Sequence, residues 1–145
     1  MEIVRAEYND LPELLTLYQQ LHPADPVPEG EALQALWREI VVDANYHILL
    51  ARADGAVAAS VTVVIVKNLT RNARPYAIVE NVITDAAHRR QGYAAALLAE
   101  AVRIAQAANC YKVSLTTGNK DAGTFAFYES CGFNRGDKTA FIRWL

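Results

Sequence analysis

The stretch ENVITDAAHRRQGYAAALLAEAVRIAQ, residues 80–106, decides the fold. It starts with an apolar segment, passes through a short polar turn and ends in a run rich in alanine and leucine, which predicts a strand, a turn and a helix in succession. The first amide N–H groups of a helix lack intrahelical partners and lie at the positive end of the helix dipole. Gly92 and Ala94 leave room for an anion at the backbone, and Arg89 and Arg90 add positive charge beside it. The turn therefore predicts a phosphate-binding site.

Two common phosphate motifs are absent. The chain has no G-x-x-x-x-G-K-[ST], and Gln91 and Ala94 do not fit a G-x-G-x-x-G fingerprint. The turn instead reads R-x-x-G-x-A, a variant of [QR]-x-x-G-x-[GA], and a second segment, NKDAGTFAFYESCGF, follows at residues 119–133. With both segments, the chain resembles the GCN5-related N-acetyltransferase (GNAT) family from about Tyr76 to Phe133.

The resemblance implies acetyl-coenzyme A as co-substrate and assigns residues to it. The backbone of Val82, Ile83 and Thr84 would pair with the pantetheine arm, and Asn119 would contact the same arm. Ala94 replaces a commoner second glycine but keeps a small side chain. The pyrophosphate would be held by the turn and the first residues of the helix, namely Arg89, Arg90, Gln91, Gly92, Tyr93, Ala94 and Ala95.

Two residues are candidates for acid–base chemistry. Tyr128 matches a family tyrosine near the coenzyme sulfur, and a phenol with a pKa of about 10 is protonated at neutral pH. Packing among Phe125 and Phe127 is the alternative role for Tyr128. Glu80 is the candidate base: the resemblance implies a glutamate here that acts on the acceptor amine, often through water, and a carboxylate in an otherwise apolar segment is costly without a partner. Its alternatives are a solvent-facing acid or an arginine partner. His88, in the polar turn, is expected to be a surface residue.

Composition excludes several classes of protein. The 145 residues, 52% of them hydrophobic and 21% charged, suit one domain spanning residues 1–145 with a sizeable core. The net charge of −2 gives no signature of nucleic-acid binding, and no apolar run reaches the roughly 18–20 residues that span a bilayer. The N-terminus lacks a signal-peptide core, so a cytoplasmic location is expected. Cys110 and Cys131 alone cannot form a zinc site, and no metal is expected.

The remaining sequence predicts the order β-α-α-β-β-β-α-β-α-β, a mixed, mostly antiparallel α/β sheet flanked by helices as in the GNAT family. Asp10 is expected to cap the first helix with Glu13 in a capping-box-like spacing. Asp54 and Gly55 predict a hairpin turn. The apolar run over residues 57–66 does not alternate, which predicts a strand buried on both faces. Asp121 is expected to cap the last helix, while Asn109 and Gly132 are expected to follow the ends of the two C-terminal helices. The last strand is expected over residues 139–144.

Two polar regions have open interpretations. In the family, the segment between the first two helices borders the acceptor pocket, so His22, Asp25 and Trp37 are candidates for substrate contact or else loop and core residues. The loop KNLTRNARP, residues 67–75, carries cations that are either solvated or form a rim for an acidic acceptor or the coenzyme phosphates: Lys67, Arg71 and Arg74.

The predicted function is acetyl-coenzyme A-dependent transfer of an acetyl group to a primary amine, with a small metabolite favoured as acceptor because the chain is compact. A peptide or protein amine and a non-catalytic acyl-coenzyme A sensor are the alternatives. No nucleic-acid or membrane partner is expected. Dimers are common in the family, and a homodimer paired through the C-terminal strand stays open.

Overall fold

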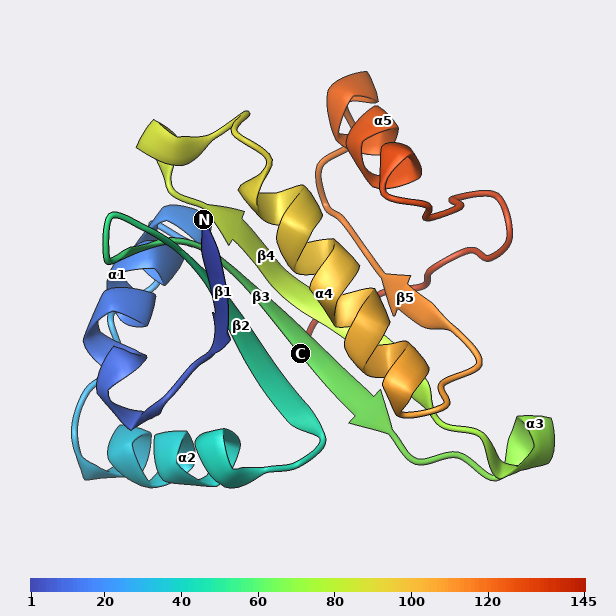
Figure 1. Cartoon of the computed structure of the whole chain (residues 1–145), viewed down its shortest axis with the longest axis horizontal. Helices are drawn as coiled ribbons and strands as arrows, with labels where there is room; N and C mark the ends of the chain where they lie inside the picture. The colour runs from blue at the N-terminus through green and yellow to red at the C-terminus, as the bar shows by residue number, and fades with distance from the viewer.

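A computed structural model describes all 145 residues and contains one five-stranded sheet with the strand order β1-β2-β3-β4-β5. Neighbouring strands are antiparallel except β4 and β5, which are parallel. Figure 1 shows α4 lying across one face of the sheet, while α1 and α2 lie on the other side of the molecule beside β1 and β2. The strands are β1 (Glu2–Arg5), β2 (Tyr46–Ala53), β3 (Ala56–Val66), β4 (Tyr76–Thr84) and β5 (Val113–Leu115). The helices are α1 (Leu11–Leu21), α2 (Glu31–Val42), the short α3 (Thr70–Ala73), α4 (Tyr93–Ala107) and α5 (Ala122–Ser130).

The central strand β3 separates two hydrophobic cores. Its alternate side chains Ala59, Val61, Val63 and Ile65 belong to the core that α4 covers with residues such as Leu97. The other core lies under α1 and α2 and consists of Ala6, Leu11, Leu14, Trp37, Ile48 and Leu50. Six consecutive residues of β3, 58–63, are buried, which confirms the prediction that this apolar strand is covered on both faces.

Several predicted turn and cap residues are confirmed. Asp54 and Gly55 both have positive φ values, 50° and 85°, as a two-residue hairpin turn requires. The Asp121 carboxylate caps α5 by accepting from the Thr124 amide at 2.7 Å. Asn109, with φ 61°, follows the end of α4, and Gly132, with φ 88°, follows the end of α5.

The predicted cap of α1 is wrong. Asp10 has helical backbone angles and makes no side-chain cap bond to α1. Its carboxylate instead accepts from the Glu7 amide at 2.7 Å and pairs with Arg52 of β2. A short 3₁₀ turn over Tyr8–Asp10 precedes α1, so the capping box forms one turn earlier, between Glu7 and Asp10.

The predicted strand over residues 139–144 does not form in the isolated chain. The segment extends away from the sheet, and its apolar side chains are exposed: Phe141 is 92% and Trp144 is 90% accessible. A strand needs a hydrogen-bonding neighbour, and β5 is only three residues long. The observed order therefore lacks the final strand, while the mixed sheet flanked by helices is as predicted. None of the helices is both long and apolar enough to cross a membrane.

Candidate active site

A bulge in β4 shapes the centre of the candidate site. Thr62 of β3 lies opposite Glu80, but Ser60 lies opposite Ile83, so the single residue Val61 faces both Asn81 and Val82. Asn81 has φ 52°, a left-handed conformation that asparagine adopts more readily than the β-branched residues around it. The bulge was not predicted from the sequence, although an asparagine within the run YAIVENVIT was its signal.

The bulge places Glu80 and Asn81 on the same side of the sheet. Val82 packs against the core under α4. Asn81 lines a cavity beside α1, and Glu80 lies close enough to Tyr46, in the core under α1 and α2, to raise the pKa of that phenol. Burial is the largest cause of the raised pKa of Tyr46, the neighbouring Tyr18 is the second, and Glu80 is the smallest. In a regular strand, adjacent side chains would point to opposite faces, so the bulge is the reason that Glu80 and Asn81 lie on the same face.

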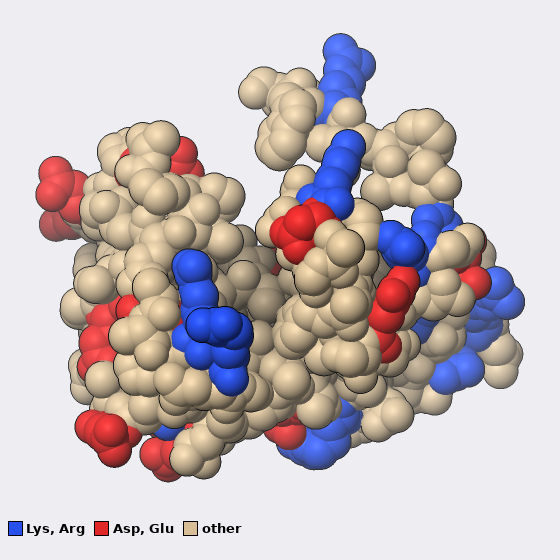
Figure 2. Space-filling model, turned by 90° about the horizontal axis from the view of Figure 1, so that it is seen from above, with Lys and Arg blue, Asp and Glu red and all other residues tan.

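Strands β4 and β5 pair over a short length. Their register covers only Ala77–Val79 of β4 and Val113–Leu115 of β5. Beyond Val79, the edge of β4 that faces β5 has no strand partner, and Val82, Ile83 and Thr84 lie on this stretch. The tip of β4, the turn before α4 and α5 lie at one end of the molecule in Figure 1. Figure 2 views that end and shows a surface hollowed between two raised parts, with a cluster of Lys and Arg beside the hollow.

The turn before α4 leaves amide groups free. Gly92, the N-cap residue, has φ 86° and makes no side-chain cap bond, and the Ala96 amide donates the first helical bond to the Gly92 carbonyl at 3.0 Å. The amides of Tyr93, Ala94 and Ala95 therefore have no partner within the helix. A Cβ on Gly92 would meet no atom within 4 Å, so the space ahead of the helix is open. The turn residues before the helix, Arg89, Arg90 and Gln91, are all exposed.

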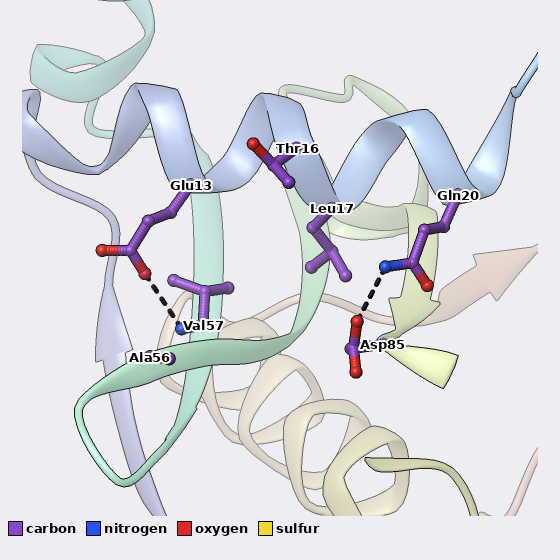
Figure 3. A pocket seen from close by; sticks show the side chains of 7 residues that line it. All are labelled: Glu13, Thr16, Leu17, Gln20, Ala56, Val57 and Asp85. Carbon is purple, nitrogen blue, oxygen red and sulfur yellow. Dashed lines mark hydrogen bonds between the residues drawn. The ribbon is translucent and has the colours of Figure 1, made fainter. Parts of the chain in front are cut away.

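Gln20 connects this turn to α1, which lies on the opposite side of the sheet from α4, by two hydrogen bonds. Its Nε2 donates to Asp85 Oδ2 at 2.7 Å, and its Oε1 accepts from the Ala86 amide at 3.0 Å. Figure 3 shows the Gln20–Asp85 bond across a cavity of about 240 Å³ between α1 and the ends of β3 and β4. The Gln20 bond is the main reason that the pKa of Asp85 lies below its usual value, with smaller contributions from His88 and Ala87. No sequence pattern pointed to Gln20 or Asp85.

His88 is part of the same turn. Its Nδ1 lies 2.9 Å from Asp85 Oδ1, and its ring contacts the Tyr93 ring edge-on with a centroid separation of 5.8 Å. The residue is half-buried rather than a freely exposed surface histidine. His88 therefore joins the turn to the first residue of α4.

Tyr128 lies on α5, packed against the α4-side core together with Phe127 and Phe133. Burial raises the pKa of Tyr128 above its ordinary value, and Cys131 adds to this effect. The phenol therefore stays protonated throughout the neutral range. Asn119 lies in the exposed loop before α5, where its Oδ1 accepts a long bond of 3.4 Å from the Asp121 amide.

A cavity of about 390 Å³ lies between α1, the loop that follows it and Asn81 of β4. Both His22 and Asp25 line it. Trp37 does not: it is 3% exposed within the core under α2, and its Nε1 donates to the Tyr8 carbonyl at 2.8 Å. Of the two open interpretations for Trp37, the structure supports the core residue. The cavity is lined by Leu15, Tyr18, Gln19, Leu21, His22, Asp25, Pro26, Val27, Pro28 and Asn81.

The cationic loop of residues 67–75 precedes β4 and lies at the opposite end of that strand from the turn before α4 (Figure 1). Arg74 donates to the carbonyls of Asn109 and Cys110 beyond the end of α4, and Arg71 stacks over the Tyr111 ring. These contacts do not support a role as a rim for coenzyme phosphates at the turn. Lys67 is exposed, as a solvated charge would be.

Comparisons with known proteins cover most of this chain. Residues 12–133 match the model of the Acetyltransferase (GNAT) family. Glucosamine 6-phosphate N-acetyltransferase 1 of Oryza sativa subsp. japonica is 32% identical over 122 residues, which are 82% of this chain and 72% of that protein. Glucosamine 6-phosphate N-acetyltransferase of Trypanosoma brucei brucei is 26% identical over 133 residues, 92% of this chain and 88% of that protein. A solved structure from Agrobacterium tumefaciens str. C58, which is named as an acetyltransferase by inference, superposes on this chain with a TM-score of 0.91 and 42% sequence identity. The match covers 99% of this chain and 100% of that chain.

Proposed function

The chain belongs to the Acetyltransferase (GNAT) family, and from this premise we propose that it transfers the acetyl group of acetyl-coenzyme A to the primary amine of a small metabolite. The observation that carries the proposal is the end of pairing between β4 and β5 after Val79. It leaves an unpaired strand edge between two groups of suitable chemistry. One is the open N-terminus of α4, and the other is the half-buried phenol of Tyr128.

The turn and the strand edge fit the co-substrate. A pyrophosphate needs N–H donors and room close to the backbone. The first amides of α4 supply the donors, and Gly92 with its open surroundings supplies the room. The unpaired edge of β4 at Val82, Ile83 and Thr84 suits the amide groups of a pantetheine arm. Asn119, whose side-chain nitrogen makes no hydrogen bond, is assigned to the same arm.

Two side chains carry the proton transfers in this proposal. The acceptor nitrogen forms a bond to the acetyl carbonyl carbon while the carbon–sulfur bond breaks. Tyr128 donates its hydroxyl proton to the departing sulfur, for which a protonated phenol in a half-buried site is suited. Glu80, exposed and in none of the ion pairs, accepts the amine proton directly or through water. Solvent then removes the proton from Glu80 and restores that of Tyr128.

The cavity beside α1 favours a small acceptor over a peptide. It is bounded by the segment after α1 and by Asn81, and its volume of about 390 Å³ is in the lower part of the range of roughly 300–1,000 Å³ found for small-molecule pockets. The names of the two curated relatives also specify a small amino-sugar acceptor for those proteins. The presence of both Tyr128 and Glu80 argues against the non-catalytic sensor.

The test is thiol release from acetyl-coenzyme A with amino acids, polyamines, amino sugars and a lysine peptide, beside a control without acceptor. We expect release above the control with one class of small amine. Release with the peptide alone would favour the protein-amine alternative. A flat panel, with the protein still stabilised by acetyl-coenzyme A in a thermal melt, would favour the sensor.

A homodimer stays a prediction, supported by the exposed apolar segment over residues 139–145 and the free outer edge of β5. Sedimentation of the whole chain and of a variant ending at Asp137 tests it. We expect a dimer that the truncation weakens, and a monomer at all concentrations would contradict the expectation.

A further inference from the structure

The cavity beside α1 has an acidic character. Asp25 is its only carboxylate, and that group takes part in no ion pair and no side-chain hydrogen bond. Glu80 does not line the cavity, but it adjoins Asn81 on the same side of the sheet, and its carboxylate is also in none of the ion pairs. Two unpaired acids near one cavity favour a cationic ligand and oppose an anionic one.

Two arginines on the strands of this part of the sheet, Arg5 of β1 and Arg52 of β2, have other partners. Arg5 Nη2 donates to the carbonyls of Asp43 and Tyr46. Arg52 pairs with the carboxylates of Asp10 and Glu13. The cavity lining itself contains no lysine or arginine, and its one basic side chain is His22. A phosphate group placed here would lose water and meet carboxylates in place of charge-assisted donors.

The rest of the lining is suited to a hydrocarbon chain. Leucine, proline and valine side chains form half of it: Leu15, Leu21, Pro26, Val27 and Pro28. The Tyr18 hydroxyl, also in the lining, is buried without a hydrogen-bond partner. A buried hydroxyl of this kind is expected to bind water or a ligand atom. The cavity thus combines an apolar wall, a free hydroxyl and negative charge.

We propose that the acceptor is an unphosphorylated amine with a hydrocarbon stem and a second cationic group, which binds at Asp25 while the reacting amine lies at Glu80. This inference rests on the proposed function and makes its acceptor more specific. It also separates this chain from the two glucosamine 6-phosphate N-acetyltransferases to which it is similar, whose names specify a phosphorylated acceptor.

Calorimetry on the protein saturated with coenzyme A tests the inference without turnover. The probes are 1,5-diaminopentane against pentylamine, and glucosamine against glucosamine 6-phosphate. We expect the diamine to bind about 1.5- to 5-fold more tightly than the monoamine, the range for one exposed ion pair. We expect glucosamine to bind more tightly than its 6-phosphate. Equal affinities for diamine and monoamine, or tighter binding of the 6-phosphate, would overturn the proposal.

Two variants localise the effect. Asp25→Asn should abolish the diamine advantage, whereas Asp54→Asn, an identical change in the β2–β3 turn outside the cavity, should preserve it. An advantage that survives Asp25→Asn would overturn the assignment of Asp25. Thiol-release assays with the same amines separate the two proposals: no release in the presence of the expected binding order would refute acetyl transfer and leave the charge preference of the cavity standing.

Discussion

Replacing Gln20 by alanine should weaken acetyl-coenzyme A binding although Gln20 lies on the far side of the sheet from α4. The change removes two hydrogen bonds, one of 2.7 Å to the Asp85 carboxylate and one of 3.0 Å from the Ala86 amide. A hydrogen bond to a charged group contributes about 1.5–3 kcal/mol and a neutral one about 0.5–1.5 kcal/mol, with the lower ends applying to this partly exposed site. We therefore expect a loss of about 2 kcal/mol in the free energy of unfolding.

Part of this loss should appear in binding, because residues 85–92 connect β4 to the first amides of α4. If half of it, about 1 kcal/mol, is needed to hold the turn in place, the dissociation constant for acetyl-coenzyme A rises roughly fivefold. Urea unfolding gives the stability and calorimetry gives the affinity. Gln106→Ala, on the exposed side of α4, corrects for the higher helix propensity of alanine.

The pH dependence of the same variant gives an independent check. The Gln20 bond lowers the pKa of Asp85, so its contribution to stability is complete above the usual pKa of an aspartate and is lost as the pH falls through the lowered value. The difference in stability between wild type and variant should therefore be constant near neutrality and shrink in acid. A variant that loses stability but binds acetyl-coenzyme A as the wild type does would refute the positioning role of Gln20.

Three further changes test other parts of the site. Gly92→Glu should reduce acetyl-coenzyme A affinity by more than about 100-fold in calorimetry. Gly92→Ala also places a side chain at the strained φ of 86°, which costs about 1–2 kcal/mol of stability, but it should reduce the affinity far less. Equal effects of the two variants on affinity would contradict the phosphate site. Tyr128→Phe should lower kcat by about 100-fold with the acetyl-coenzyme A affinity kept, and an unchanged kcat would remove Tyr128 as the acid. Trp37→Ala should cost about 3–5 kcal/mol in urea unfolding and leave the order of acceptor preference unchanged, whereas an altered order would return Trp37 to the acceptor site.

The sequence predicted the elements whose signals are local. The hairpin at Asp54–Gly55, the cap at Asp121 and the helix that begins after Gly92 each depend on a few neighbouring residues. The prediction that Asp10 caps α1 was wrong for a non-local reason, because one oxygen of its carboxylate accepts from Arg52, 42 positions away. The strand over residues 139–144 failed because β-propensity does not supply a partner strand.

The candidate site divides in the same way. The turn at residues 89–92 and Tyr128 could be predicted as phosphate-binding and acid residues because short motifs carry them, and both roles stay predictions. Gln20, Tyr18 and Tyr46 were missed because their roles depend on contacts between distant elements, which one sequence does not reveal. The role of Trp37 could not be decided between core packing and substrate contact, because a tryptophan on an amphipathic helix fits both roles until its burial is known.

The left-handed residue Asn81 is the position in β4 at which a deletion leaves the faces of the following residues unchanged, because it is the extra residue of the bulge. Deleting it would restore regular alternation in β4 and remove the extra residue opposite Val61. Glu80 would keep its place opposite Thr62 and Val82 would lie opposite Val61, so the residues that follow would keep their register and their faces, while the cavity beside α1 would lose the Asn81 side chain. In a scan of all single substitutions, position 81 should tolerate glycine and aspartate better than valine or isoleucine, the reverse of the preference at its strand neighbours.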